Sequence, residues 1–215
     1  MNTLTIEILG QHFSLHPDGA AFWVEQRMLL VADVHLGKTA HFRKHGFAVP
    51  HEVAHYNFQK LDNVLQSFEA EKVIFLGDLF HSYVNQEWEA FQHWVARQHV
   101  AMTLVSGNHD IIPQEKYETL GIDVTDVLSI GAFVLTHHPE THEGFFNICG
   151  HVHPGVRLKG KGKQALSLPC FYHEVIRLVL PALGAFTGKF IVKPKKGESV
   201  YGIVGEKVML LTTRT

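Results

Sequence analysis

Short apolar runs alternate with longer amphipathic stretches through the first half of the chain. The runs at 28–32, 72–76 and 100–105 have the length of buried strands. Between them, 51–69 and 86–98 carry apolar residues at helical spacing. Further strands are predicted for 4–9, 21–24, 130–136 and 145–149. Strands that alternate with helices in this way predict an α/β fold.

The C-terminal part of the chain, 156–211, is rich in glycine and in residues typical of strands. Hairpins are predicted at Lys161–Lys163 and at Lys196–Glu198, and a turn at His16–Gly19 is expected to join the first two strands. A short helical or turn segment is expected after the strand at 100–105. We find no repeat, low-complexity tract or linker, so residues 1–215 are expected to form a single domain.

The composition is that of an ordinary globular protein. Of 215 residues, 46% are hydrophobic and 19% are charged, and a formal net charge of −2 gives no global basic field that would indicate nucleic acid. Cys149 and Cys170 lack CxxC spacing, which argues against a disulfide framework or a zinc ribbon. We recognise neither a signal peptide nor an apolar run of bilayer length, and we expect a cytoplasmic protein with no membrane partner.

Five of the predicted strands end where residue types that bind metals begin. These residues are Asp33 and His35, Asp78, Asn108 and His109, His137, and His151 and His153. In layered α/β folds, binding sites collect beyond the carboxyl ends of the strands, so these side chains are expected to converge. Taken singly, each is more often a turn residue or a surface group. As an ordered series, they supply carboxylates, an amide oxygen and imidazoles, which suit two divalent metals such as Mn²⁺, Fe²⁺ or Zn²⁺.

These motifs resemble, in order, those of the calcineurin-like metallophosphoesterase superfamily. The matching motifs are Asp33-x-His35, Gly77-Asp78, Gly107-Asn108-His109-Asp110, His137 and Gly150-His151-x-His153. The resemblance implies an α/β fold in which two facing mixed β-sheets are flanked by helices, as a four-layer αββα sandwich. It also implies an enzyme, a phosphoesterase that depends on two divalent metal ions.

The resemblance assigns a role to each matching residue. One metal ion is held by Asp33, His35, Asp78 and His153. The other is held by Asp78, Asn108, His137 and His151, so that Asp78 bridges the pair. Such a pair of cations clamps the attacking and leaving oxygens. The position of His109 is that of the leaving-group acid or a donor to the transition state, which makes His109 and Asp78 the catalytic residues.

Two neighbouring histidines compete for the fourth motif. The superfamily pattern is an apolar run followed by His, one residue and Pro, which places the ligand at His137 in Thr136-His137-His138-Pro139. By strand alternation, the side chain of His138 is then expected to point away from the metals.

Two stretches favour the nucleases of this superfamily. The second motif continues as Leu79-Phe80-His81, which is more similar to DNA-repair nucleases than to protein phosphatases, and His81 would then support His109. The alternative is that His81 is a solvent-exposed residue at the entry of a helix. The loop from Asp33 to Pro50 resembles that of bacterial ligase-associated DNA damage response endonucleases. The cations of this loop that are expected to contact substrate phosphates are Lys38, Arg43 and Lys44.

The resemblance therefore implies a phosphodiesterase that acts on DNA as a repair endonuclease, with Mn²⁺ as the expected metal. Its expected associates are DNA and, functionally, a DNA ligase, a helicase and an exonuclease-like protein. Two alternatives stay open: a small-molecule phosphodiesterase or phosphatase acting on nucleotide-like substrates, and a binding protein with a degenerate metal site. The second is weak because no ligand or acid position is missing. The basic stretches 157–163 and 193–196 are either phosphate contacts or solvated edges.

Overall fold

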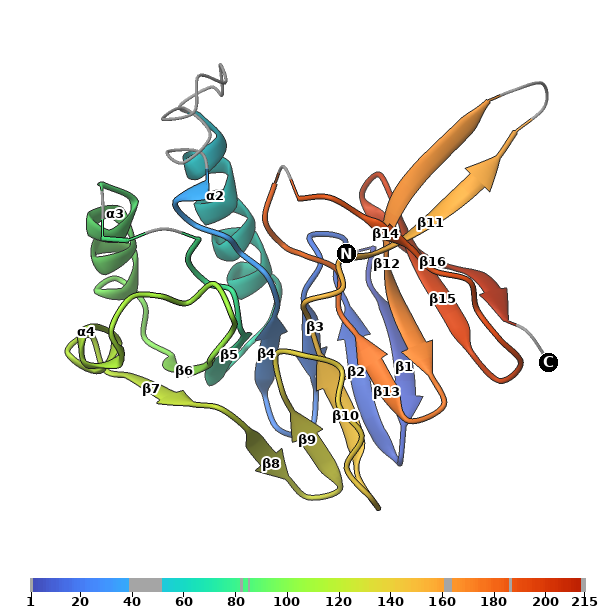
Figure 1. The fold of residues 1–215 in the computed structure, drawn as a ribbon, viewed down its shortest axis with the longest axis horizontal. Helices are drawn as coiled ribbons and strands as arrows, with labels where there is room; N and C mark the ends of the chain where they lie inside the picture. The colour runs from blue at the N-terminus through green and yellow to red at the C-terminus, as the bar shows by residue number, and fades with distance from the viewer. Residues whose placement is uncertain are drawn as a thin grey trace.

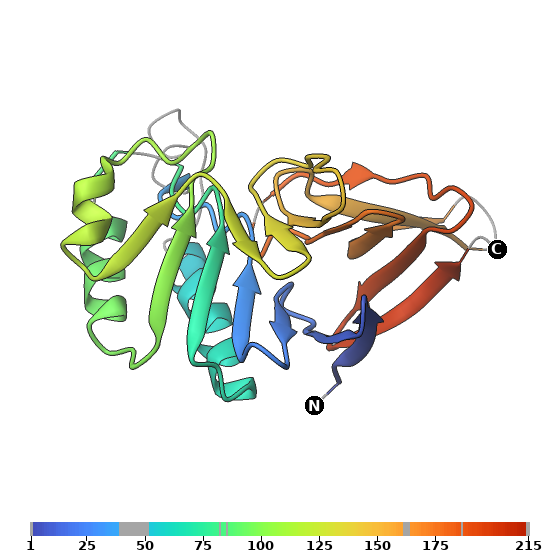
Figure 2. The same ribbon diagram turned by 90° about the horizontal axis from the view of Figure 1, so that it is seen from below.

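Two β-sheets face each other in the computed structural model, which describes residues 2–38, 52–81, 83–84, 86–160, 164–185 and 187–213 (Figures 1 and 2). The strands of the first sheet lie side by side in chain order: β1 (Leu4–Ile8), β2 (Gln11–Leu15), β3 (Ala21–Trp23), β4 (Met28–Val31), β5 (Lys72–Leu76), β6 (Ala101–Val105) and β7 (Ile122–Thr125). β1 to β4 pair antiparallel, whereas β4 to β7 pair parallel. The carboxyl ends of β4, β5 and β6 therefore meet at one edge of this sheet.

The second sheet is built from the rest of the chain. Its strands are β8 (Leu128–Ile130), β9 (Phe133–Leu135), β10 (Phe146–Cys149), β11 (Pro154–Lys159), β12 (Ala165–Glu174), β13 (Arg177–Val179), β14 (Phe190–Ile191), β15 (Ser199–Val204) and β16 (Lys207–Thr213). The order is β14-β11-β12-β13-β10-β9-β8, and β15 pairs with both β12 and β16. β9, β10 and β13 pair parallel, so this sheet is mixed as well. β11 and the start of β12 project from the sheet as a two-stranded arm (Figure 1).

The described helices, α2 (Glu52–Ser67), α3 (Gln86–Val95) and α4 (Gln114–Glu118), cover the face of the first sheet that is turned away from the second (Figure 1). Their apolar side chains, with Leu61, Phe91 and Tyr117 among them, form one core with residues of β4, β5 and β6. Burial of this apolar stripe holds each helix on the sheet. No helix among the described residues is long and apolar enough to cross a membrane.

A second core fills the space between the sheets. Phe13 and Trp23 of the first sheet contact Phe133 of the second, with ring centroids 5.6 and 4.7 Å apart. On the outer face of the second sheet, Tyr172 and Val192 belong to a smaller apolar cluster, to which the described helices contribute no residue. The expected α/β architecture of two facing mixed sheets is confirmed.

Several local predictions need correction. β2 was not predicted because only Phe13 and Leu15, which face the core, are apolar among its five residues. The expected turn at His16–Gly19 is present but joins β2 to β3. The predicted hairpin at Lys196–Glu198 is wrong, because β14 pairs with β11 and the hairpin of this region joins β15 to β16. The predicted hairpin at Lys161–Lys163 lies outside the described residues.

Candidate metal centre

The structure brings the seven predicted metal ligands to one place, where the two sheets meet. Asp33 and His35 follow β4, Asp78 follows β5 and Asn108 follows β6. From the other sheet, His137 follows β9, and His151 and His153 follow β10. Each group lies at the carboxyl end of a parallel strand, where the polar ends of the backbone and of the side chains can point at a common ligand. The predicted convergence is therefore observed, and the individual roles remain predictions.

A first cluster consists of Asp33, His35 and His153, each of which can place one ligand atom within 4.8 Å of the others. The Nε2 atoms of His35 and His153 lie 3.1 Å apart, and His153 Nε2 is 3.4 Å from Asp33 Oδ1. Asp33 and His35 are buried, with 0% and 3% of their surface exposed. These three residues match the ligand set predicted for one metal ion, apart from the shared Asp78.

A second cluster surrounds His137. His137 Nε2 lies 3.1 Å from Asn108 Oδ1, 3.1 Å from His151 Nδ1 and 3.3 Å from Asp78 Oδ1. The other ring nitrogen, Nδ1, is 3.0 Å from the carbonyl oxygen of Leu76, to which only a protonated Nδ1 can donate. This contact favours the tautomer whose Nε2 lone pair faces the cluster, as a metal ligand requires.

Asp78 lies between the two clusters. Its Oδ1 is 3.3 Å from His137 Nε2, and its Oδ2 is 3.9 Å from His35 Nε2. The backbone N–H of His109 donates to the same Oδ1 at 2.9 Å. A carboxylate in this position can reach a cation in either cluster, which is the geometry expected of a bridging ligand.

An unsatisfied carboxylate oxygen of the site fits a bound cation. Within the described residues, buried Asp33 Oδ1, an atom of the first cluster, has no hydrogen-bond partner. Such atoms are costly to bury unless something binds them. Burial, followed by the charge of Lys38, lowers the pKa of His35 to about 2, and burial also lowers the pKa of His151. Both imidazoles are thus neutral at pH 7 and can use their lone pairs to bind a metal.

The backbone at the site is strained. Asp33, His35, Asp78, His151 and His153 all have positive φ, between 49° and 66°. Few residues other than glycine adopt this conformation, and when they do the cost is about 1–3 kcal/mol each. Five of the seven predicted ligands share it, which indicates that the strand ends are shaped to aim these side chains rather than to maximise stability.

Gly77 shows how closely the two sheets approach here. A Cβ atom at this position would collide with the ring of His137, and the φ of Gly77 is +77°. The glycine in the second motif is therefore required by the imidazole of the fourth. This contact between segments far apart in the chain could not be derived from spacing alone.

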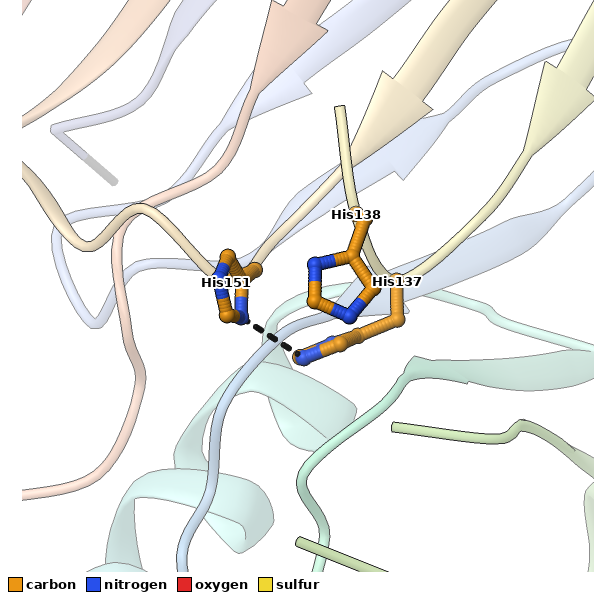
Figure 3. A group of neighbouring side chains, drawn as sticks. All are labelled: His137, His138 and His151. Atoms are coloured by element: carbon orange, nitrogen blue, oxygen red, sulfur yellow. Dashed lines mark hydrogen bonds between the residues drawn. The ribbon is translucent and has the colours of Figure 1, made fainter. Parts of the chain in front are cut away.

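The expectation that His138 points away from the site is wrong. Figure 3 shows its ring beside those of His137 and His151, and the ring centroid of His138 lies 4.0 Å from that of His151. These three histidines can each place a ring nitrogen within 4.8 Å of the others. Strand alternation does not apply because β9 ends at Leu135, and the hydroxyl of Thr136 donates to the carbonyl oxygen of His138.

We predict that His137→Ala lowers the occupancy of the second metal and that His138→Ala does not. His137 is 2% exposed and contacts Asp78 and Asn108, whereas His138 is exposed. Metal analysis of the two purified variants after dialysis tests this difference. Loss of about one metal equivalent in His138→Ala, with none lost in His137→Ala, would reverse the assignment.

His109 lies at the exposed rim of the site rather than among the ligands. Its ring stacks on His81 with centroids 4.2 Å apart and lies 5.9 Å from the ring of His35. The expected proximity of His81 and His109 is therefore present, as a stacked pair. An imidazole at the rim can approach a substrate oxygen without displacing a metal ligand.

Of the three cations predicted to contact phosphate, the structure describes only Lys38. Lys38 is half-buried beside the clusters; burial lowers the pKa of its ammonium group, while the charges of Asp78 and Asp33 oppose that shift. Arg43 and Lys44 lie outside the described residues. Lys38 can therefore meet an anion at the metal centre, and the proposed role of the other two rests on sequence.

Three residues that support the site were given no role by the sequence, although Asp110 belongs to the third motif. Asp110 accepts backbone N–H bonds from Phe80 and Gly107 at 3.0 and 2.9 Å, and its burial raises its pKa to about 6 despite these donors. Asn57 of α2 donates to the carbonyl oxygen of Val34 at 3.2 Å. Glu87 of α3 accepts the N–H of Gly37 at 2.6 Å. These contacts fix the loops that carry the ligands, and all but the bond between Gly107 and Asp110 join segments far apart in sequence.

The chain is similar to known proteins in sequence and in structure. The family model described as calcineurin-like phosphoesterase matches residues 26–164. The nuclease MPE from Pseudomonas putida is similar over 98% of this chain and 100% of its own, with 31% identity and a TM-score of 0.82. A protein of unknown function from Aquifex aeolicus is 16% identical over 63% of this chain and 82% of its own, with a TM-score of 0.43. A search of curated protein sequences gives no match.

Proposed function

Because this chain belongs to the calcineurin-like phosphoesterase family, we propose that it is a two-metal phosphodiesterase that cleaves DNA as an endonuclease. The observation that carries the proposal is the pair of ligand clusters with Asp78 between them. The metal-dependent phosphoesterase activity follows from the family. The choice of DNA as the substrate goes beyond the family, and the similarity to a nuclease along nearly the whole chain supports that choice.

The residues of the site divide the chemistry between them. One cation would be held by Asp33, His35 and His153, and the other by Asn108, His137 and His151. Asp78 would contact both cations. Bound divalent cations lower the pKa of water towards 7 and neutralise charge on a phosphate. Lys38 would add a further positive charge beside the phosphate. His109 would give a proton to the departing oxygen from the exposed rim.

Mn²⁺ is the metal we propose for both positions. The donor set mixes carboxylate and amide oxygens with imidazole, and Mn²⁺ accepts both kinds of ligand, as Fe²⁺ and Zn²⁺ also do. We further propose a cytoplasmic role in DNA repair, in functional association with a DNA ligase, a helicase and an exonuclease-like protein. The loop that follows the first motif supports this role, through its resemblance to ligase-associated endonucleases.

The proposed function is tested by a substrate panel with the Mn²⁺-loaded enzyme: supercoiled plasmid, single-stranded DNA, a small diester and a phosphomonoester. We expect cleavage of DNA and of the small diester, loss of both with EDTA, and recovery with Mn²⁺. DNA affinity should fall with salt by about 0.7–0.9 log units per log unit for each phosphate contacted, while hydrolysis of the small diester should change little. Cleavage of the small diester without any cleavage of DNA would favour a small-molecule phosphodiesterase.

A further inference from the structure

A hollow of about 190 Å³ lies directly beside the candidate metal centre. It is bounded by α2, by the start of β11, by β12 and by described residues of 182–185 and 187–189, and one of its walls is the predicted metal ligand His153. Two of the side chains that line it, Lys60 and Lys189, are cationic, and no carboxylate is among its described lining residues. A small anion in this hollow would therefore be next to the reacting phosphate, and the charged side chains that it would meet among the described lining residues are the two lysines.

The two lysines differ in their surroundings. The ammonium group of Lys60 donates to the carbonyl oxygen of Leu183 at 2.5 Å, and burial lowers its pKa although the charge of Asp18 opposes this. Lys189 is exposed and, within the part of the chain that the structure describes, makes no ion pair. The hydrogen bond to Leu183 thus fixes the position of Lys60 in the wall, and Lys189 has a charge available for a ligand.

Hydrogen bonds tie this hollow to the metal centre. The N–H of Leu183 donates to the carbonyl oxygen of Ala32, and that of Gly184 donates to the carbonyl oxygen of Asp33. Buried Asn57 accepts the N–H of Ala185 at 2.9 Å and donates to the first-motif loop. The segment that lines the hollow is therefore fixed to the same residues that aim Asp33, so the distance between the two sites is set by the fold.

The absence of a side chain at Gly155 leaves room for the stem of Lys189. A Cβ atom at this position would lie 2.9 Å from the Cβ of Lys189, which is closer than real side chains approach, and 3.4 Å from its Cδ. The stem of Lys189 thus lies across the backbone of β11, two residues after His153. This packing holds the start of an otherwise exposed side chain beside the hollow.

We propose that this hollow binds the phosphate adjacent to the scissile one on a DNA strand, with Lys189 as its main contact and Lys60 as its fixed charge. The inference rests on the proposed function, because it assumes a polynucleotide at the metal centre. Lysine binds phosphate as a point charge, so the site needs no further donors to recognise it. The subsite would favour a polymer over a small diester, which has no second phosphate.

The test uses deoxytrinucleotides, which have two linkages. Where one linkage is a neutral methylphosphonate, the other is cleaved without a charged neighbour, whereas in the all-phosphate trinucleotide the neighbour is charged. The all-phosphate trinucleotide and bis(p-nitrophenyl) phosphate complete the set. For the Mn²⁺-loaded enzyme, we expect neutralisation on one side of the cleaved bond to lower kcat/KM about tenfold, the lower end for a charged hydrogen bond.

Lys189→Ala should cleave the neutral and charged substrates equally well and should hydrolyse bis(p-nitrophenyl) phosphate at the normal rate. Lys189→Arg should restore the preference for the charged neighbour. Lys207→Ala removes an exposed lysine of β16 that does not line the hollow, and it should behave as the unmodified enzyme. Metal content and thermal melting are expected to be unchanged in all three, because neither lysine contacts the ligand clusters.

The outcomes separate the subsite from the function on which it rests. If Lys189→Ala retains the full preference for the charged neighbour, the subsite is wrong while DNA cleavage stands. An equal loss of preference in Lys207→Ala would show a diffuse charge effect and also overturn it. If bis(p-nitrophenyl) phosphate is hydrolysed but neither the trinucleotides nor longer DNA is cleaved, the proposed function fails and the subsite fails with it.

Discussion

Asp78→Asn is expected to reduce phosphodiester hydrolysis to background and to lower the occupancy of both metal positions. The carboxylate lies 3.3 Å from His137 Nε2 on one side and 3.9 Å from His35 Nε2 on the other, so it is shared by both clusters. A negative charge between two cations offsets their repulsion, and the neutral amide of asparagine does not. Metal analysis of the purified variant and its activity on a small diester measure both effects.

The same substitution leaves the fold with most of its contacts. The amide introduced by Asp78→Asn keeps a carbonyl oxygen that can accept the N–H of His109, as Asp78 Oδ1 does at 2.9 Å. Thermal melting in EDTA should therefore be close to that of the unmodified protein. Asp126→Asn, at an exposed position between β7 and β8, is the matched control and should retain activity and metals. Two full metal equivalents in Asp78→Asn would show that Asp78 does not bridge.

The arrangement of the ligand residues was predictable because it follows from strands that are buried on both faces. β4, β5 and β6 are short apolar runs between amphipathic helices, a pattern that predicts parallel strands whose carboxyl ends coincide. The residues that follow them could therefore be expected together. β2 escaped prediction because polar side chains occupy most of its positions, and only its pairing with β1 and β3 makes it a strand.

Other features of the site depend on contacts that sequence spacing does not contain. His138 lies beside His151 because β9 ends two residues before His137, so strand alternation no longer describes its direction. Asn57 and Glu87 are ordinary helix residues in sequence, and their importance comes from the loops that fold onto them. No local pattern signals that a helix amide will bond the backbone of Val34.

The last prediction is that His109→Ala keeps both metals but slows DNA cleavage by roughly 10²–10⁴-fold, the range for loss of a general acid. His109 is exposed at the rim, and its ring contacts His81 rather than the ligand atoms. Its link to Asp78 is made by the backbone N–H, which alanine retains. Truncating the side chain should thus remove the proton donor and leave the ligand clusters in place. Metal analysis and single-turnover kinetics on DNA measure the two quantities.

The dependence of the rate loss on the leaving group shows which catalytic function His109→Ala removes. A p-nitrophenolate departs without a proton, whereas a sugar alkoxide needs one, so aryl esters of one nucleotide should lose less rate in His109→Ala as the phenol becomes more acidic. His93→Ala, at an exposed position in the last turn of α3, controls for removal of a surface imidazole. A rate loss that is equal for all leaving groups would mean that His109 stabilises charge on the phosphate instead. Loss of metal would make it a ligand, which its position at the rim argues against.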